Sequence, residues 1–177
     1  VHHPSLPSTE RQSILGVPLT GVCSSLLVPG LGCVNGCRFC STTHFFGKTY
    51  TSYLATGRAI FENAVRIADA RGTDTFFVMD ENFLKDTGRA RELLAEMERE
   101  QRFFRFQIFS SAEAILAFGL DDLVRLGVNF VWMGVETKSR DANFSKNAGV
   151  DPQWLVRELR DRGITVLASG ILCMEHH

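Results

Sequence analysis

Residues 75–82 read Thr75-Phe76-Phe77-Val78-Met79-Asp80-Glu81-Asn82, a dense apolar run that ends in three polar residues. A continuous apolar run of this length predicts a strand buried on both faces, which is typical of parallel sheets. Before it, the apolar residues between 59 and 68 recur at helical spacing and end at Gly72. The stretch therefore predicts a helix, a glycine turn, a buried strand and a polar tip, in that order.

The same order recurs further along the chain. Residues 126–137 pass through the apolar run from Asn129 to Val135 and end at Glu136, and residues 162–176 contain an expected strand from Ile164 to Met174. Strands are also expected at Val22–Val28 and Phe103–Phe109. Helices are expected around Leu93–Met97, as one broken or two short helices in 112–126 with Asp121 as a cap, and from Asp151 to Gly163. Apolar strands alternating with amphipathic helices predict an α/β fold, a parallel sheet curved into a partial (β/α) barrel.

The length sets the number of units. A full eight-unit barrel takes about 250 residues, so 177 residues less a leader of about 20 leave room for about five strands. Residues 1–20 carry Pro4, Pro7 and Pro18 and are interpreted as a leader or linker, and residues 21–177 as the core domain. Because the chain lacks a starting Met and stops at His177 directly after an apolar stretch, we expect a fragment whose last strand is covered by a missing domain or another subunit.

Composition narrows the function classes. The chain is 45% hydrophobic and 22% charged, so it can bury a core. Its net charge of −1 gives no overall field toward nucleic acid or an anionic membrane. It contains neither a run of about 18 apolar residues nor the plan of a signal peptide, so we expect no membrane span and a cytoplasmic location.

The polar tips follow the carboxyl ends of the expected strands. These tips are Cys33–Cys40, Asp80–Asn82, Ser110–Ser111 and Glu136–Thr137. Because parallel α/β folds bind ligands at this edge, the four loops are expected to form one site.

The first of these loops has the spacing C-x3-C-x2-C at Cys33, Cys37 and Cys40, with Phe39 before the third cysteine. An odd count of five cysteines, three of them bunched within eight residues, favours a metal or redox site over a disulfide framework. A [4Fe-4S] cluster normally takes four thiolates, so three leave one iron open to another ligand. The alternative is a structural zinc site completed by Cys23 or His44.

This loop resembles the signature of the radical S-adenosylmethionine (SAM) superfamily, and the similarity extends from about Val22 onward. The resemblance implies a six-unit partial barrel, of which about five strands are present here. It also implies that Cys33, Cys37 and Cys40 hold a [4Fe-4S] cluster whose open iron binds the methionine part of SAM. Reductive cleavage of SAM then starts radical chemistry on a substrate that the sequence does not identify.

The resemblance assigns further SAM-binding residues one by one. At the end of the second strand, Asp80 or Glu81 would meet the SAM amino group in place of a Gly-Gly-Glu pattern, or would cap the following helix. Glu136 matches a Gly-x-Glu end found near the SAM ribose or methionine. Ser110 and Ser111 either reach the same ligand or only start a helix. Ile171 fits a segment that packs against adenine, and Cys173 is interpreted as a packing residue.

The pattern is most similar to the branch of cobalamin-binding radical SAM enzymes and methylthiotransferases. That branch implies cobalamin as a further cofactor, bound outside this chain segment. The family also implies a reducing partner of the flavodoxin or ferredoxin type. Two other classes stay open at this point, an iron–sulfur electron-transfer protein and a zinc-stabilised binding module.

Overall fold

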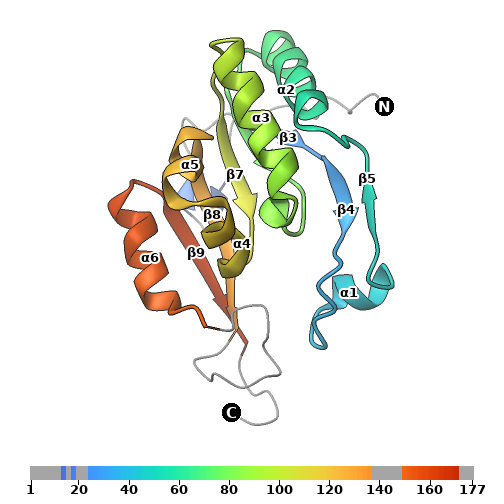
Figure 1. Cartoon of the computed structure of the whole chain (residues 1–177), viewed down its shortest axis with the longest axis vertical. Helices are drawn as coiled ribbons and strands as arrows, with labels where there is room; N and C mark the ends of the chain where they lie inside the picture. Colours follow the sequence, from blue (N-terminus) through green and yellow to red (C-terminus); the bar gives the residue numbers. More distant parts are fainter. Residues whose placement is uncertain (1–12, 15–16, 19–23, 137–148, 172–177) are drawn as a thin grey trace.

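A five-stranded parallel sheet organises the protein (Figure 1). The computed structural model describes residues 13–14, 17–18, 24–136 and 149–171. The strands lie in the order β3-β6-β7-β8-β9, and every neighbouring pair is parallel. Their bounds are β3 Ser24–Leu27, β6 Thr75–Val78, β7 Arg105–Phe109, β8 Val128–Glu136 and β9 Thr165–Gly170. The predicted α/β fold with five parallel strands is confirmed. Because spatial order follows chain order, each crossover moves one strand along, as in successive units of a barrel.

Helices fill the crossovers between these strands. They are α2 (Gly57–Arg71), α3 (Thr87–Arg99), α4 (Ala112–Phe118), α5 (Leu120–Arg125) and α6 (Pro152–Asp161), with a 3-10 turn η1 (Phe83–Lys85) after β6. Successive side chains of a strand point to opposite faces of the sheet. Those on the face covered by the helices are fully buried, among them Phe76, Ile108 and Met133. On the other face Met79, Trp132 and Leu167 are exposed. The hydrophobic core therefore lies between the helices and one face of the sheet.

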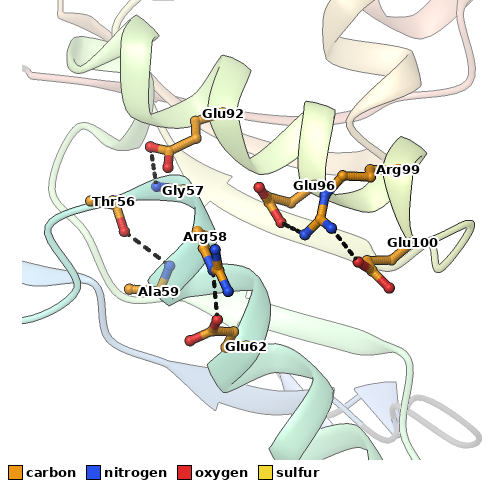
Figure 2. A network of polar contacts seen from close by, with 9 residues as sticks. All are labelled: Thr56, Gly57, Arg58, Ala59, Glu62, Glu92, Glu96, Arg99 and Glu100. Atoms are coloured by element: carbon orange, nitrogen blue, oxygen red, sulfur yellow. Dashed lines mark hydrogen bonds and ion pairs between the residues drawn. The ribbon is translucent and has the colours of Figure 1, made fainter.

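The contact between α2 and α3 depends on a glycine at the start of α2. A Cβ at Gly57 would stand 2.2 Å from the peptide nitrogen of Leu93, so only glycine allows this approach. The Gly57 N–H donates to Glu92 Oε2 at 2.9 Å, and the Ala59 N–H donates to Thr56 Oγ1 at 3.0 Å (Figure 2). Orphan amides at the N-terminus of α2 are thus satisfied partly by a carboxylate of α3.

An antiparallel hairpin stands apart from the main sheet and was not predicted. It pairs β4 (Gly30–Gly32) with β5 (Tyr50–Ser52), and the short helix α1 (Ser41–Phe45) lies in the connection between them. Figure 1 shows the hairpin and α1 extending along one side of the molecule. Two further strands of two residues, β1 (Ser13–Ile14) and β2 (Val17–Pro18), pair within the segment interpreted as a leader.

Some sequence expectations are corrected. Gly119, with φ 102°, precedes α5 as its N-cap, and Asp121 lies inside the first turn of that helix, so it is not the cap. Asp151 does cap α6, accepting from the N–H groups of Gln153 and Trp154, with Pro152 as the first helical residue. The last strand runs from Thr165 to Gly170, and residues 172–174 of the expected strand lie outside the described residues.

In the sequence, the Arg/Glu run from Arg89 to Arg102 predicts a solvated helix face, but the structure shows this face of α3 to be only partly solvated. Most of its arginines and glutamates pair at the surface, but Arg89 is buried. No helix in the part of the chain that the structure describes is long and apolar enough to cross a membrane.

Candidate functional site

The three cysteines lie in the connection between β4 and β5. Gly32 ends β4 with φ 95° and pairs with Tyr50, and Cys33 follows it directly. A Cβ at Gly32 would stand 2.3 Å from the carbonyl oxygen of Thr49, so the strands approach too closely for any side chain there. The hairpin therefore fixes both ends of the cysteine loop.

Short-range hydrogen bonds shape the loop itself. The Cys40 N–H donates to the Cys37 carbonyl at 3.2 Å, and Gly36, directly before Cys37, adopts φ 66°. His44, expected as a loop or substrate-side residue, places its Nε2 2.9 Å from the carbonyl oxygen of Arg38. These contacts hold the chain between the second and third cysteines in a tight turn.

The thiols are half-buried, and the third one is chemically distinct. Burial acts to raise the pKa of the Cys40 thiol, but polar groups of Thr43 and Thr42 at the start of α1 outweigh it and hold that pKa below its ordinary value. A lowered thiol pKa favours the thiolate, which is the form that binds iron.

A cavity of about 290 Å³ joins the loop to the carboxyl edge of the sheet. It brings together residues from the loop and from β6, β7, β8 and β9. The lining residues central to the site are Cys33, Cys37, Phe39, Cys40, Glu81 and Ser110, with Trp132 and Ser169 on later strands. Three of the four polar tips that were predicted to share one site therefore border this cavity, and the side chains of the fourth, Glu136–Thr137, lie outside the described residues.

Asn82 connects two of the tips inside the protein. Its Oδ1 accepts from the Ser110 hydroxyl at 3.2 Å and from the Ser111 N–H at 3.1 Å, and its Nδ2 donates to Ser111 Oγ at 3.2 Å. All three residues are buried. The network fixes the end of β6 to the end of β7, and it accounts for both serines without excluding a ligand contact by Ser110.

Asp80 forms a second buried network, which we call the Asp80 clamp (Tyr50, Asp80 and Arg89). Its Oδ2 accepts from the Tyr50 hydroxyl at 2.6 Å and from Arg89 Nη2 at 2.7 Å, while Arg89 Nη1 donates to the Tyr50 oxygen at 2.7 Å. Its Oδ1 accepts from the Asn82 N–H at 3.2 Å. Burial and the Asp80 carboxylate raise the pKa of Tyr50 to about 12, so this phenol stays protonated at neutral pH.

Glu81, the next residue, faces the cavity instead. Partial burial and the neighbouring Asp80 carboxylate raise the pKa of Glu81, and a hydrogen bond with Thr42 opposes that rise. Asp80 lines a separate cavity of about 320 Å³ together with Tyr50 and Arg89. Of the two carboxylates that the sequence left undecided, Glu81 is the one exposed in the cysteine cavity.

The remaining predicted residues are less well defined. Ile171 is partly buried just beyond β9 and does not line the cavity, although its neighbour Ser169 does. Glu136 ends β8, but its side chain lies outside the described residues, as do Cys23 and Cys173. Sequence reasoning missed Tyr50, Asn82 and Arg89, because their roles depend on contacts across 28 to 39 residues of sequence.

The donor set fits an iron–sulfur cluster. Three thiols of one loop border one cavity, and soft thiolates are the ligands that iron–sulfur clusters take. Among residues 24–136 and 149–171, no three His, Cys, Asp or Glu side chains gather closely enough to hold a single metal ion. By the chemistry of their thiols, Cys33, Cys37 and Cys40 are the residues that would hold a cluster here.

A thiolate loop set over the carboxyl edge of a parallel α/β sheet defines a class of cofactor-binding domain, and comparison with known proteins specifies the family. The sequence pattern of the radical SAM superfamily matches residues 27–177. The chain belongs to the radical SAM superfamily.

The chain is similar to two methyltransferases. Cytidylyl-2-hydroxyethylphosphonate methyltransferase of Streptomyces wedmorensis is 36% identical over 62 residues, which are 35% of this chain and 11% of that protein. A structure of TsrM from Kitasatospora setae, a radical SAM methyltransferase with cobalamin and a [4Fe-4S] cluster bound, superposes on 83% of this chain and 30% of its own with a TM-score of 0.65 and 16% identity.

A second structure of TsrM, with tryptophan substrate and a SAM analogue bound, gives a TM-score of 0.65 and 16% identity over 86% of this chain and 31% of its own. At this identity the likeness shows the fold alone. The chain spans less than a third of the length of each of these relatives.

Proposed function

We propose that the chain is the catalytic core of a radical SAM enzyme, in which Cys33, Cys37 and Cys40 hold a [4Fe-4S] cluster and the adjoining cavity holds SAM. The observation that carries the proposal is that the three thiols and the Glu81 carboxylate border the same cavity. When bound, the cluster supplies the electron that splits the SAM sulfonium and so starts radical chemistry.

The protein's own residues would then orient SAM. The carboxylate of Glu81 opposes the charge of the SAM ammonium group, which favours binding because the pair is partly shielded from water. Asp80 already accepts hydrogen bonds from Tyr50, Arg89 and Asn82, so its role is to hold the chain next to Glu81 in place. Ser110 presents a hydroxyl at the cavity wall, and Phe39 closes the wall between the second and third cysteines.

Methyl transfer is the reaction class we favour, because both named relatives are methyltransferases. We place cobalamin, which the TsrM structure contains, outside the residues that the structure describes. An electron donor of the flavodoxin or ferredoxin type is the partner that the chemistry requires. The methyl acceptor is left unassigned.

The test is anaerobic reconstitution with iron and sulfide, followed by absorbance and electron paramagnetic resonance spectra before and after addition of SAM and dithionite. We expect a reduced-cluster signal that changes with SAM, and release of 5′-deoxyadenosine or methionine. A cluster indifferent to SAM would indicate an electron-transfer protein, and bound zinc without a chromophore would indicate a binding module.

Glu81→Gln is expected to weaken SAM binding about tenfold, since it removes a charged hydrogen-bond acceptor from the cavity wall. The wild-type affinity should fall as the pH is lowered below neutral through the raised pKa of Glu81, because protonation removes the charge that attracts the ammonium. SAM titrations from about pH 4, near the ordinary pKa of a glutamate, up to about pH 7, where an α-amino group stays protonated, would measure both effects.

The matched control is Glu62→Gln, an exposed glutamate of α2 whose partner is Arg58. It should bind SAM with wild-type affinity and pH dependence. If Glu81→Gln retained the wild-type affinity and its decline at low pH, another group would hold the ammonium.

A further inference from the structure

The hairpin closes the cysteine loop at both ends, and a hydrogen bond between Thr42 and Glu81 is a further contact between the loop and the segment after β6. Residues 33–49 leave the hairpin at Gly32 and return at Tyr50, and these two residues pair directly across the strands. The neighbouring backbone contacts, from Tyr53 and Leu54 N–H to the Pro29 carbonyl, lie at the opposite end of the hairpin. At its hairpin end, the position of the loop therefore depends on what holds Tyr50.

The Tyr50 side chain extends across Gly30 toward the sheet. A Cβ at Gly30 would stand 2.3 Å from the Tyr50 hydroxyl oxygen, so glycine is needed for the side chain to follow this path. The hydroxyl ends on Asp80 Oδ2 at 2.6 Å, at the carboxyl end of β6. One phenol thus links the end of the cysteine loop to the strand end that carries Glu81.

Arg89 completes the link from a third element. It belongs to the first turn of α3, its side chain is 4% exposed, and its guanidinium carbon lies 5.6 Å from the Tyr50 ring centre and 5.5 Å from that of Phe83. Two of its nitrogens donate to the Tyr50 oxygen and to Asp80 Oδ2. Because it contacts both partners, Arg89 sets the angle between the hairpin and the end of β6.

We infer that Tyr50 and Arg89 are positioning residues that hold the cysteine loop against the end of β6, so that the thiols and Glu81 face one cavity. The inference rests on the proposed function for its cofactor consequence, but the positioning itself is a property of the protein without cofactors. Neither residue touches the cysteine cavity. They act through the backbone on either side of the loop and through Asp80, which precedes Glu81.

The first experiment measures amide hydrogen exchange in the cofactor-free protein. Tyr50→Phe removes only the hydroxyl and leaves the Arg89–Asp80 ion pair, so the fold should persist. We expect residues 30–52 to exchange at least about tenfold faster, because the hydroxyl's two hydrogen bonds, to Asp80 and from Arg89, are both lost, while α2 and β7 exchange as in wild type. The matched control is Tyr53→Phe, an exposed tyrosine just after β5, which should change neither region.

The second experiment measures loss of iron from the reconstituted protein to a chelator. Tyr50→Phe and Arg89→Lys should lose iron several-fold faster than wild type, whereas Arg91→Lys, on the same helix but paired with Asp122, should not.

Uniformly faster hydrogen exchange over the whole protein, or wild-type exchange in residues 30–52, would overturn the positioning role. If wild type itself binds no cluster, the proposed function fails, and the exchange experiment still decides this inference.

Discussion

Replacing Cys37 with alanine is expected to leave a folded protein that no longer retains an iron–sulfur cluster. A four-iron cluster takes one ligand per iron, and the loop offers three thiols, so removing one leaves two irons without a protein ligand. Iron content should fall from about four per chain to background. Cys37 lies in a turn outside the hydrophobic core, so the folded structure does not depend on it.

Iron and sulfide analysis after anaerobic reconstitution measures the effect, with circular dichroism to check the fold. Cys23→Ala and Cys173→Ala are the matched controls, and both should keep a full cluster. Normal iron in Cys37→Ala would mean that the ligand assignment is wrong. Loss of bound zinc in Cys23→Ala would favour the zinc module instead.

The repeated units of the fold could be predicted because each depends on local patterns. The run at 76–79 is apolar without interruption, and the apolar residues of α2 recur every three or four positions up to Gly72, which adopts φ 65°. Burial of a continuous strand and one helix face is decided within such a segment. Strand ends were less predictable, because tertiary contacts decide where pairing stops, as at Gly170.

The hairpin β4–β5 could not be predicted in the same way. Gly30-Leu31-Gly32 has little strand propensity, and its partner lies 18 or more residues further along the chain. What stabilises the pairing is the absence of a Cβ at each glycine, which allows Tyr50 and Thr49 to approach. That reason is visible only once the two segments are side by side.

The cluster ligands of the candidate site could be predicted from the sequence, but the residues that hold the site in place could not. The cysteine spacing identifies three thiols from sequence, and the structure brings them to the cavity that Glu81 and Ser110 also border. Which of Asp80 and Glu81 faces the cavity could be decided only from the Asp80 clamp, because two adjacent carboxylates look alike in a sequence. Arg89 was expected on a solvated helix face, since arginine is rarely buried without a partner, and the partner comes from another element.

Arg89→Met is expected to destabilise the protein by about 3–5 kcal/mol. The Arg89–Asp80 pair is almost fully buried, with 4% and 2% of the two side chains exposed, and removing one partner leaves an uncompensated charge in the interior. Urea unfolding followed by circular dichroism would measure the loss. Arg91→Met, on the same helix but half exposed, should cost about 1 kcal/mol or less.

A double variant separates the buried charge from the loss of packing. Asp80→Asn with Arg89→Met removes both charges, so it should be more stable than Arg89→Met alone, even though it contains one more substitution. Such non-additivity is expected only if the unpaired Asp80 carboxylate causes most of the stability loss in Arg89→Met. If the two substitutions simply added, or if Arg89→Met unfolded at the wild-type urea concentration, Asp80 would not depend on Arg89, and the clamp could not hold the hairpin through it.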